Sequence, residues 1–271
     1  MEKEKIIRVE NVKKYYPIPK ASIFQRQTDF VKAVDGVSFD LYQGETLGIV
    51  GESGSGKSTV ARLVNHLIKP TEGQIYFRDQ DITALNTKQT KDFRKNIQMV
   101  FQSPYGTLDP RKTIGYSLKE PYLIHGVGTS KEHQKNIHRL LELVDLPTRS
   151  EQKYPHEFSG GQLQRINIAR AISLEPEVVI CDESVSALDV SVQAQVLNLL
   201  KDLQKELGLT YLFISHDLNV VRYMCDRIAV MNAGKIIELD TAKNVYASPK
   251  DAYTKKLLEA IPINSPHERT T

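Results

Sequence analysis

One short run of residues constrains the fold of this chain more than any other feature. Between Gly51 and Ser58 the sequence reads Gly-Glu-Ser-Gly-Ser-Gly-Lys-Ser, which is the spacing of a phosphate-binding loop. Such a loop needs a buried strand before it and a helix after it. The apolar residues 47–50 and the periodic segment 59–68 have those two patterns. We therefore expect an α/β fold in which this loop joins a strand to a helix.

The residue types in this loop explain how it would hold a nucleotide. Glycines let successive backbone N–H groups turn toward the phosphates, and the helix N-terminus adds a partial positive charge. We expect Lys57 to reach the β- and γ-phosphates and the Ser58 hydroxyl to bind Mg²⁺. The residues expected to bind the nucleotide here are Gly51, Glu52, Ser53, Gly54, Ser55, Gly56, Lys57, Ser58 and Thr59.

The overall composition excludes several other classes of protein. The 36 basic and 33 acidic residues give a net charge of +3, which is too balanced for a dedicated nucleic-acid binder. Cys181 and Cys225 lack metal-ligand spacing, and Cys181 lies in an apolar run where we expect a small buried hydrophobe. The charged residues 1–5 argue against a secretory signal, and no segment approaches the roughly 18 apolar residues of a membrane span. Any role at a membrane must therefore depend on a partner.

The hydrophobic pattern predicts two groups of strands. Three segments fit an antiparallel layer, namely 6–12, 37–41 and 73–77, with an irregular surface excursion at 17–30 between the first two. Four short runs are apolar almost throughout, as expected for a parallel sheet that is covered on both faces, namely 97–101, 178–181, 211–214 and 228–231. A core helix is predicted over 192–207, a hairpin turn at 232–234 and a last helix at 253–260.

These patterns divide the chain into four parts. Between 103 and 169 the strand signal disappears and helical spacing takes over, so this segment is expected to be a helical subdomain inserted into the core. It separates residues 1–102, the N-terminal part of the nucleotide-binding core with the antiparallel layer, from residues 170–240, the C-terminal part of that core. Residues 241–271 would form a C-terminal helix and a polar tail, disordered from 264 onward.

Two further segments carry candidate chemistry. Asp182 and Glu183 directly follow a buried strand, where we expect Asp182 to bind the metal through its hydration shell and Glu183 to act on the attacking water. Residues 159–162 place a serine, two glycines and a glutamine at the start of a helix, which presents N–H groups and a hydroxyl to an anion. Because the phosphate loop already holds its own nucleotide, the γ-phosphate on a facing subunit is the expected anion.

With these residues in order, the chain resembles an ATP-binding-cassette (ABC) ATPase subunit over nearly its whole length. The six matching motifs are Walker A (51–58), the Q-loop Gln102, the signature Ser159-Gly160-Gly161-Gln162, Walker B (178–183), the D-loop 186–189 and the H-loop His216. The resemblance implies a RecA-like P-loop core with a parallel sheet, an antiparallel β layer and an inserted α-helical subdomain. It also implies that two cassettes pair head to tail and trap MgATP between Walker A of one and the signature of the other.

The resemblance assigns a role to each matching position. The catalytic group would be Glu183, His216 and Gln102, with His216 contacting the γ-phosphate. The Mg²⁺ ligands would be Ser58, Gln102 and Asp182. Tyr16 matches the aromatic residue that stacks on adenine, with Tyr15 next to it. The signature residues and Asp189 of the D-loop would complete the nucleotide site.

Within the family, residues 101–111, 185–195 and 248–262 resemble ATPase subunits of oligopeptide, dipeptide and nickel permeases. That branch implies an importer that takes up oligopeptides or dipeptides, with a second, different ATPase subunit, two transmembrane permease subunits and an extracellular solute-binding protein. The chain would sit peripherally on the cytoplasmic face of the membrane. A nickel or metal-chelate importer, a soluble ABC ATPase acting on nucleic acid or ribosomes, and a P-loop kinase or GTPase remain as alternatives.

Overall fold

The computed structural model describes residues 4–18 and 29–260. Its centre is a six-stranded sheet in the order β10-β9-β3-β8-β7-β6. The strands are β3 (Thr46–Val50), β6 (Ile97–Val100), β7 (Val178–Asp182), β8 (Thr210–Ile214), β9 (Arg227–Asn232) and β10 (Lys235–Thr241). The first five run parallel, and β10 pairs antiparallel with β9 through the predicted hairpin turn. The four apolar runs therefore form parallel strands, as predicted.

The central sheet is covered on both faces, which explains why its strands are apolar almost throughout. Every residue of β3, β7 and β8 is buried. Successive side chains of a strand point to opposite faces, so Cys181 and Phe213 join one apolar cluster while Ile180 and Leu212 join the other. Cys181 is fully buried and unpaired, as expected of a small hydrophobe.

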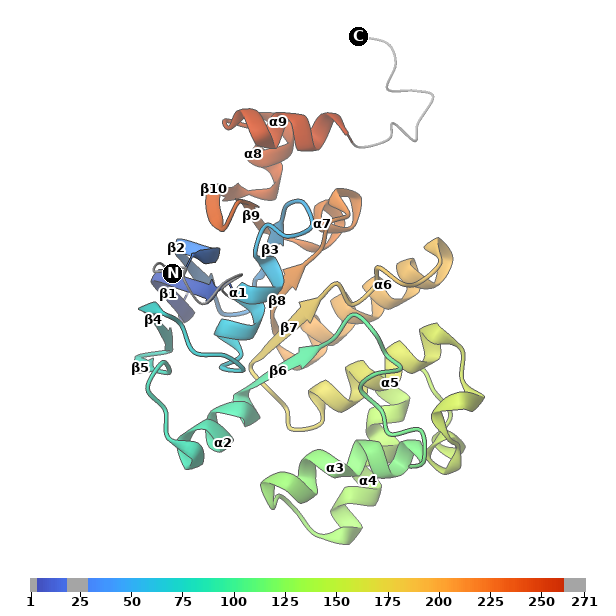
Figure 1. Ribbon diagram of the computed structural model, residues 1–271. Coiled ribbons are helices and arrows are strands. Elements are labelled where there is room, and N and C mark those ends of the chain that lie inside the picture. The colour runs from blue at the N-terminus through green and yellow to red at the C-terminus, as the bar shows by residue number, and fades with distance from the viewer. Residues whose placement is uncertain (1–3, 19–28, 261–271) are drawn as a thin grey trace.

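A second, antiparallel sheet lies beside the core (Figure 1), in the order β2-β1-β4-β5. It contains β1 (Lys5–Pro17), β2 (Phe30–Tyr42), β4 (Glu72–Phe77) and β5 (Gln80–Asp81). The three predicted strands are present, but β1 and β2 extend farther than the hydrophobic pattern indicated. Their pairing continues to Pro17 and Phe30, so both ends of the expected excursion are strand. Residues 19–28 of that excursion, and the expected disordered tail 264–271, lie outside the described residues.

The helices of the core are α1 (Lys57–Val64), α2 (Thr87–Asn96), α6 (Val190–Leu207), α7 (Leu218–Met224), α8 (Ala242–Ala247) and α9 (Ala252–Glu259). The prediction that α1 spans 59–68 was wrong at its C-terminal end. The backbone of His66 turns left-handed (φ 49°), and the amide of Leu67 donates back to the carbonyl of Arg62, which closes the helix early. Helix α6 ends as predicted, because Gly208 adopts φ 67° there.

The segment 103–169, which the structure describes throughout, contains helices and no strand. It holds α3 (Ile114–His125), α4 (Ser130–Leu143), the short 3₁₀ turns Thr148–Gln152 and Pro155–Glu157, and the start of α5 (Gly160–Ile172). Figure 1 shows these helices gathered on one side of the molecule, beyond β6. Helix α5 continues past residue 169, so the insertion and the core share one continuous helix.

Candidate nucleotide-binding site

The carboxyl ends of three neighbouring strands bring the candidate residues together. Strands β3, β8 and β7 are adjacent and parallel, so the segments that follow them emerge at the same edge of the sheet. These segments are the phosphate loop after β3, Asp182 and Glu183 at the end of β7, and His216 after β8. Residues more than 160 positions apart in the sequence thus share one site.

An open pocket of about 330 Å³ lies at the phosphate loop. Its lining includes six of the predicted loop residues and Glu183, together with Val31, Lys32, Ala33, Ala233 and Gly234. The last five were missed by sequence reasoning. They come from β2 and from the β9–β10 turn, and Gly234 donates its N–H to the carbonyl of Ser55 at 3.0 Å. The turn motif was recognised in the sequence, but no local signal places it against the phosphate loop.

Two positions of the loop have no room for a side chain larger than that of glycine, because backbone of the neighbouring strands lies against them. Gly51 has φ 150° and Gly56 has φ 106°, conformations that L side chains rarely adopt. A Cβ on Gly51 would lie 2.1 Å from the carbonyl oxygen of Met231, and one on Gly56 would lie 2.1 Å from that of Ala33. Backbone from β9 and β2 therefore presses directly on the loop and leaves no room for a side chain.

Lys57 is buried under the loop and is held by it. Its Nζ donates to the carbonyl oxygens of Gly51 and Glu52, both at 2.8 Å. Burial lowers the pKa of the Lys57 ammonium, while the nearby carboxylates of Glu183 and Asp182 act in the opposite direction. A cation with so little access to water is well suited to bind a phosphate that enters the pocket.

Ser58 and Asp182 form the candidate metal site. The Ser58 hydroxyl donates to Oδ1 of Asp182 at 2.9 Å. Burial raises the pKa of Asp182, and the hydrogen bond from Ser58 partly counteracts that effect. Among residues 4–18 and 29–260, no cluster of three or more His, Cys, Asp or Glu side chains could hold a metal alone. This oxygen pair fits Mg²⁺, which is commonly bound by one or two protein oxygens together with phosphates and water.

Glu183 is the centre of a hydrogen-bonded group. Nε2 of Gln102 donates to its Oε2 at 3.0 Å, and Nδ1 of His216 lies 3.4 Å from its Oε1. Nε2 of Gln102 also donates to the hydroxyl of Ser186 at 3.3 Å. The backbone of Glu183 is left-handed (φ 49°), which is a strained conformation of the kind that gathers at functional sites. All three predicted catalytic residues therefore lie together in this chain.

The signature residues do not reach this pocket within the described part of the chain. Ser159 caps α5 by accepting the N–H of Gln162 at 3.3 Å, and Gln162 Oε1 accepts the N–H of Ser159 at 3.0 Å. Asp189 caps α6 by accepting the N–H of Val192 at 3.0 Å, and such hydrogen bonds lower its pKa. Gly160 and Gly161 form the first turn of α5. The pocket lining contains none of these residues.

The two adjacent tyrosines near the pocket have different surroundings. The hydroxyl of Tyr15 donates to Asp35. Tyr16 is 39% exposed and pairs across the sheet with Val31, which lines the pocket. Neither tyrosine lines the pocket itself, and Nζ of Lys14 lies 5.3 Å from the centre of the Tyr16 ring, so stacking of Tyr16 on adenine stays a prediction.

The parallel sheet, the phosphate loop and the acidic pair after β7 define a P-loop nucleoside triphosphatase. The sequence profile described as ABC transporter matches residues 34–186, more than half of the chain. The chain belongs to the ABC transporter family and is an ATP-binding, ATP-hydrolysing member of it. In the described ranges, no helix is both long and apolar enough to cross a membrane.

Several curated proteins are similar along most of the chain. The oligopeptide transport ATP-binding protein AppF of Bacillus subtilis is 55% identical over 96% of this chain and 79% of its own length. A putative peptide import ATP-binding protein of Brucella ovis is 50% identical over 92% of this chain and 79% of its own. The glutathione import ATP-binding protein GsiA of Salmonella typhimurium is 48% identical over 98% of this chain. The match spans only 42% of the length of GsiA.

Solved structures show the same fold. The ATP-binding cassette MJ0796, determined as a dimer in a post-hydrolysis state with ADP and Pi, has a TM-score of 0.75 and 31% identity. The similarity covers 87% of this chain and 98% of that one. The cbiO1 protein of Clostridium perfringens, part of the cbiONQ ABC transporter complex, has a TM-score of 0.78 and 28% identity over 90% of this chain and 92% of its own. The expected P-loop cassette fold is confirmed.

Proposed function

We propose that this chain is the ATP-hydrolysing subunit of an importer that takes up oligopeptides or dipeptides. The observation that carries the proposal is the group formed by Lys57, Ser58, Asp182 and Glu183 at one sheet edge, beside a pocket open to a nucleotide. The relatives named for oligopeptide, peptide and glutathione import support peptides as the substrate class. The nickel and nucleic-acid alternatives gain no support from these names.

Hydrolysis follows from the positions of the side chains. ATP places its phosphates on the loop, and the Lys57 ammonium exchanges the carbonyls of Gly51 and Glu52 for phosphate oxygens. Glu183 accepts a proton from the water that attacks the γ-phosphorus, the bond to the bridging oxygen breaks, and ADP and phosphate leave. Ser58 and Asp182, with Gln102 as a third expected ligand, would hold Mg²⁺, which would supply charge neutralisation at the phosphates. His216, beside Glu183, donates a hydrogen bond to the γ-phosphate.

Gln102 links this chemistry to the rest of the chain. In the structure its amide donates to the carboxylate of Glu183, the same group that must accept a proton from water. This hydrogen bond uses one of the two carboxylate oxygens of Glu183 and makes that oxygen less basic until Gln102 moves. Gln102 directly precedes the helical insertion 103–169. Movement of that insertion therefore makes or breaks the hydrogen bond between Gln102 and the carboxylate of Glu183.

The active site is completed by a second cassette. The capped N-terminus of α5 offers the Ser159 hydroxyl and the first N–H groups of the helix, but it lies outside the pocket of its own chain. In a head-to-tail dimer with a second, different ATPase subunit, Ser159 and Gly161 face the γ-phosphate of the partner. The dimeric arrangement of the similar cassette MJ0796 supports this assembly.

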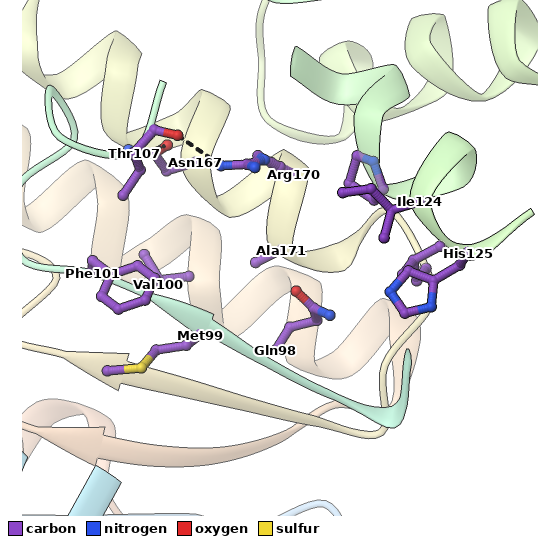
Figure 2. Close-up of a pocket in the computed structure, with 12 residues that line it drawn as sticks. Gln98, Met99, Val100, Phe101, Thr107, Ile124, His125, Asn167, Arg170 and Ala171 are labelled. Atoms are coloured by element: carbon purple, nitrogen blue, oxygen red, sulfur yellow. Dashed lines mark hydrogen bonds between the residues drawn. The ribbon is translucent and has the colours of Figure 1, made fainter. Parts of the chain in front are cut away.

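A second pocket, of about 200 Å³, is the docking site for a permease subunit. Figure 2 shows Gln98 and Met99 of β6 on one side, Arg170 and Ala171 of α5 on another, and Ile124 with His125 of α3 closing the end. Two apolar residues of its lining are exposed, Ile124 by 55% and Phe101 by 41%. Two such docking events, one per cassette, attach the ATPases to the cytoplasmic face of the membrane. An extracellular solute-binding protein delivers the peptide.

The buried polar atoms of this second pocket support docking. Nδ2 of Asn167 and Nδ1 of His125 have no hydrogen-bond partner among the described residues. Arg170 is already bonded to the carbonyl of Thr107 and to Glu120. Buried polar atoms are normally satisfied, so a partner that brings an acceptor for the Asn167 amide, a polar group for Nδ1 of His125 and an apolar side chain would complete this pocket.

The substitution Glu183→Gln tests the proposal. It removes the base but keeps the shape and an acceptor for Gln102. Steady-state hydrolysis by the assembled transporter should fall by about 10²- to 10⁴-fold while ATP binding persists. Glu206→Gln, at an exposed position on α6, is the matched control and should leave hydrolysis unchanged. Undiminished turnover by the Glu183→Gln transporter would overturn the assignment.

A further inference from the structure

The phosphate loop is held from outside by the C-terminal helix. The backbone N–H of Glu52, the second residue of the loop, donates to the hydroxyl of Tyr253 at 3.1 Å. Tyr253 lies in the first turn of α9, 201 positions farther along the chain. No pattern in the sequence connects the two residues, and neither the ATP-binding motifs nor the pocket lining includes Tyr253.

The helix that carries Tyr253 is itself fixed to the core. The buried carboxylate of Glu238, on β10, accepts the backbone N–H groups of Lys250 at 2.9 Å and Asp251 at 3.1 Å. Asp251 then caps α9 by accepting the N–H of Tyr253 at 2.7 Å. Figure 1 shows α8 and α9 together above β9 and β10, at the end of the chain's described part. These bonds, all between groups of the protein itself, hold Tyr253 in place.

The peptide groups around Glu52 have few other anchors that survive ATP binding. The carbonyl of Glu52 accepts Nζ of Lys57 at 2.8 Å and the N–H of Ser55 at 3.2 Å. The proposed mechanism moves Lys57 from these carbonyls to the phosphates. Once Lys57 has left, the bond from Glu52 to Tyr253 still ties the Glu52 peptide group to α9, in addition to the bond from Gly234 to Ser55 farther along the loop.

We propose that Tyr253 is a positioning residue for ATP binding, and that the C-terminal segment 248–260 supports the phosphate loop. This inference rests on the proposed function, because it assigns a role at the same site. Tyr253 touches neither substrate nor reacting atoms. Its hydroxyl keeps the first turn of the loop in the conformation that receives the phosphates, so the loop does not have to be ordered when ATP binds.

The test compares Tyr253→Phe with Tyr246→Phe. Both variants lose one hydroxyl from the last two described helices, Tyr246 from α8 and Tyr253 from α9, but the Tyr246 hydroxyl donates to the carbonyl of Leu218 and not to the phosphate loop. In the assembled transporter, Tyr253→Phe should raise the KM for ATP by about 2- to 10-fold, the range for one lost hydrogen bond, with kcat unchanged. Tyr246→Phe should leave KM unchanged. An unchanged KM in Tyr253→Phe, or an equal rise in both variants, would overturn the proposal.

Hydrogen exchange without nucleotide separates this inference from the proposed function. In the nucleotide-free chain, the Glu52 amide should exchange faster in Tyr253→Phe than in wild type or Tyr246→Phe, by a similar factor of about 2 to 10. The exchange rate of the Glu52 amide reports on its hydrogen bond to Tyr253, and its measurement does not require ATP hydrolysis. Equal exchange in all three proteins would contradict the support role even if the chain proves to be an active ATPase.

Discussion

Gly161 in the signature motif offers a test whose size follows from the structure. A Cβ at this position would lie 2.2 Å from Cγ1 of Val192, whereas ordinary contacts are 3.4–4 Å. Val192 cannot easily move, since its N–H is bonded to Asp189 at 3.0 Å and a β-branched side chain in a helix has one preferred rotamer. Gly161→Ala must therefore separate α5 from α6 by more than about 1 Å or force a strained rotamer.

Overpacking of this kind typically costs 1–3 kcal/mol, so we expect Gly161→Ala to destabilise the chain by about 2 kcal/mol. For a chain of this size that corresponds to a fall in Tm of about 4 to 8 °C, measured by circular dichroism. Adding Val192→Ala removes the clashing atom, and the double variant should melt above Gly161→Ala alone. A Gly161→Ala variant that melts like wild type, or a further fall in its Tm when Val192→Ala is added, would contradict this prediction.

Two other predictions concern the metal site and the docking pocket. Because burial raises the pKa of Asp182, its ionised form opposes folding near neutral pH, and this cost disappears as acidification protonates the group. Near neutral pH, the Tm of the nucleotide-free Asp182→Asn chain should thus equal or exceed the Tm of wild type. The difference in Tm should shrink on acidification. Mg²⁺-dependent hydrolysis by the variant should be nearly lost. A variant that is clearly less stable than wild type near neutral pH would contradict this. Ile124→Glu should release the chain from permease subunits during co-purification from membranes while ATP binding persists. Leu67→Glu, at a 42% exposed site outside that pocket, should still co-purify with the permease subunits. If the Ile124→Glu chain also co-purifies with them, the permease does not dock at this pocket.

Much of the core could be predicted because its signals are local. The phosphate loop, the apolar runs of the parallel strands and the helical spacing of the insertion each depend on neighbouring residues. The position of Glu183 at the carboxyl end of β7 followed from the same reasoning. Parallel strands place their carboxyl ends at one edge of the sheet, so Asp182 could be expected near Ser58. In the structure the Ser58 hydroxyl lies 2.9 Å from Oδ1 of Asp182.

The remaining features depend on how distant segments meet. The early end of α1 depends on the left-handed turn at His66; histidine is enriched in that conformation, but only a small share of non-glycine residues adopt it, so the residue type alone does not predict the turn. Ala33 and Gly234 reach the nucleotide pocket through the register of β2 and the place of the β9–β10 turn, which no local pattern encodes. The bond between Glu52 and Tyr253 likewise depends on where the C-terminal helix docks. Long-range packing of this kind is invisible in a single sequence.

The central claim is that each working site contains residues from two cassettes. The most direct test is the ATPase rate per chain as a function of concentration, measured for the isolated subunit and for the purified transporter. We expect the isolated subunit, which lacks its different partner, to hydrolyse ATP only when it pairs with a second copy of itself, so that its rate stays below that of the transporter and falls on dilution. The rate of the transporter, in which the cassettes are held together, should stay constant. An isolated chain that hydrolyses ATP at the transporter's rate at every dilution would contradict it.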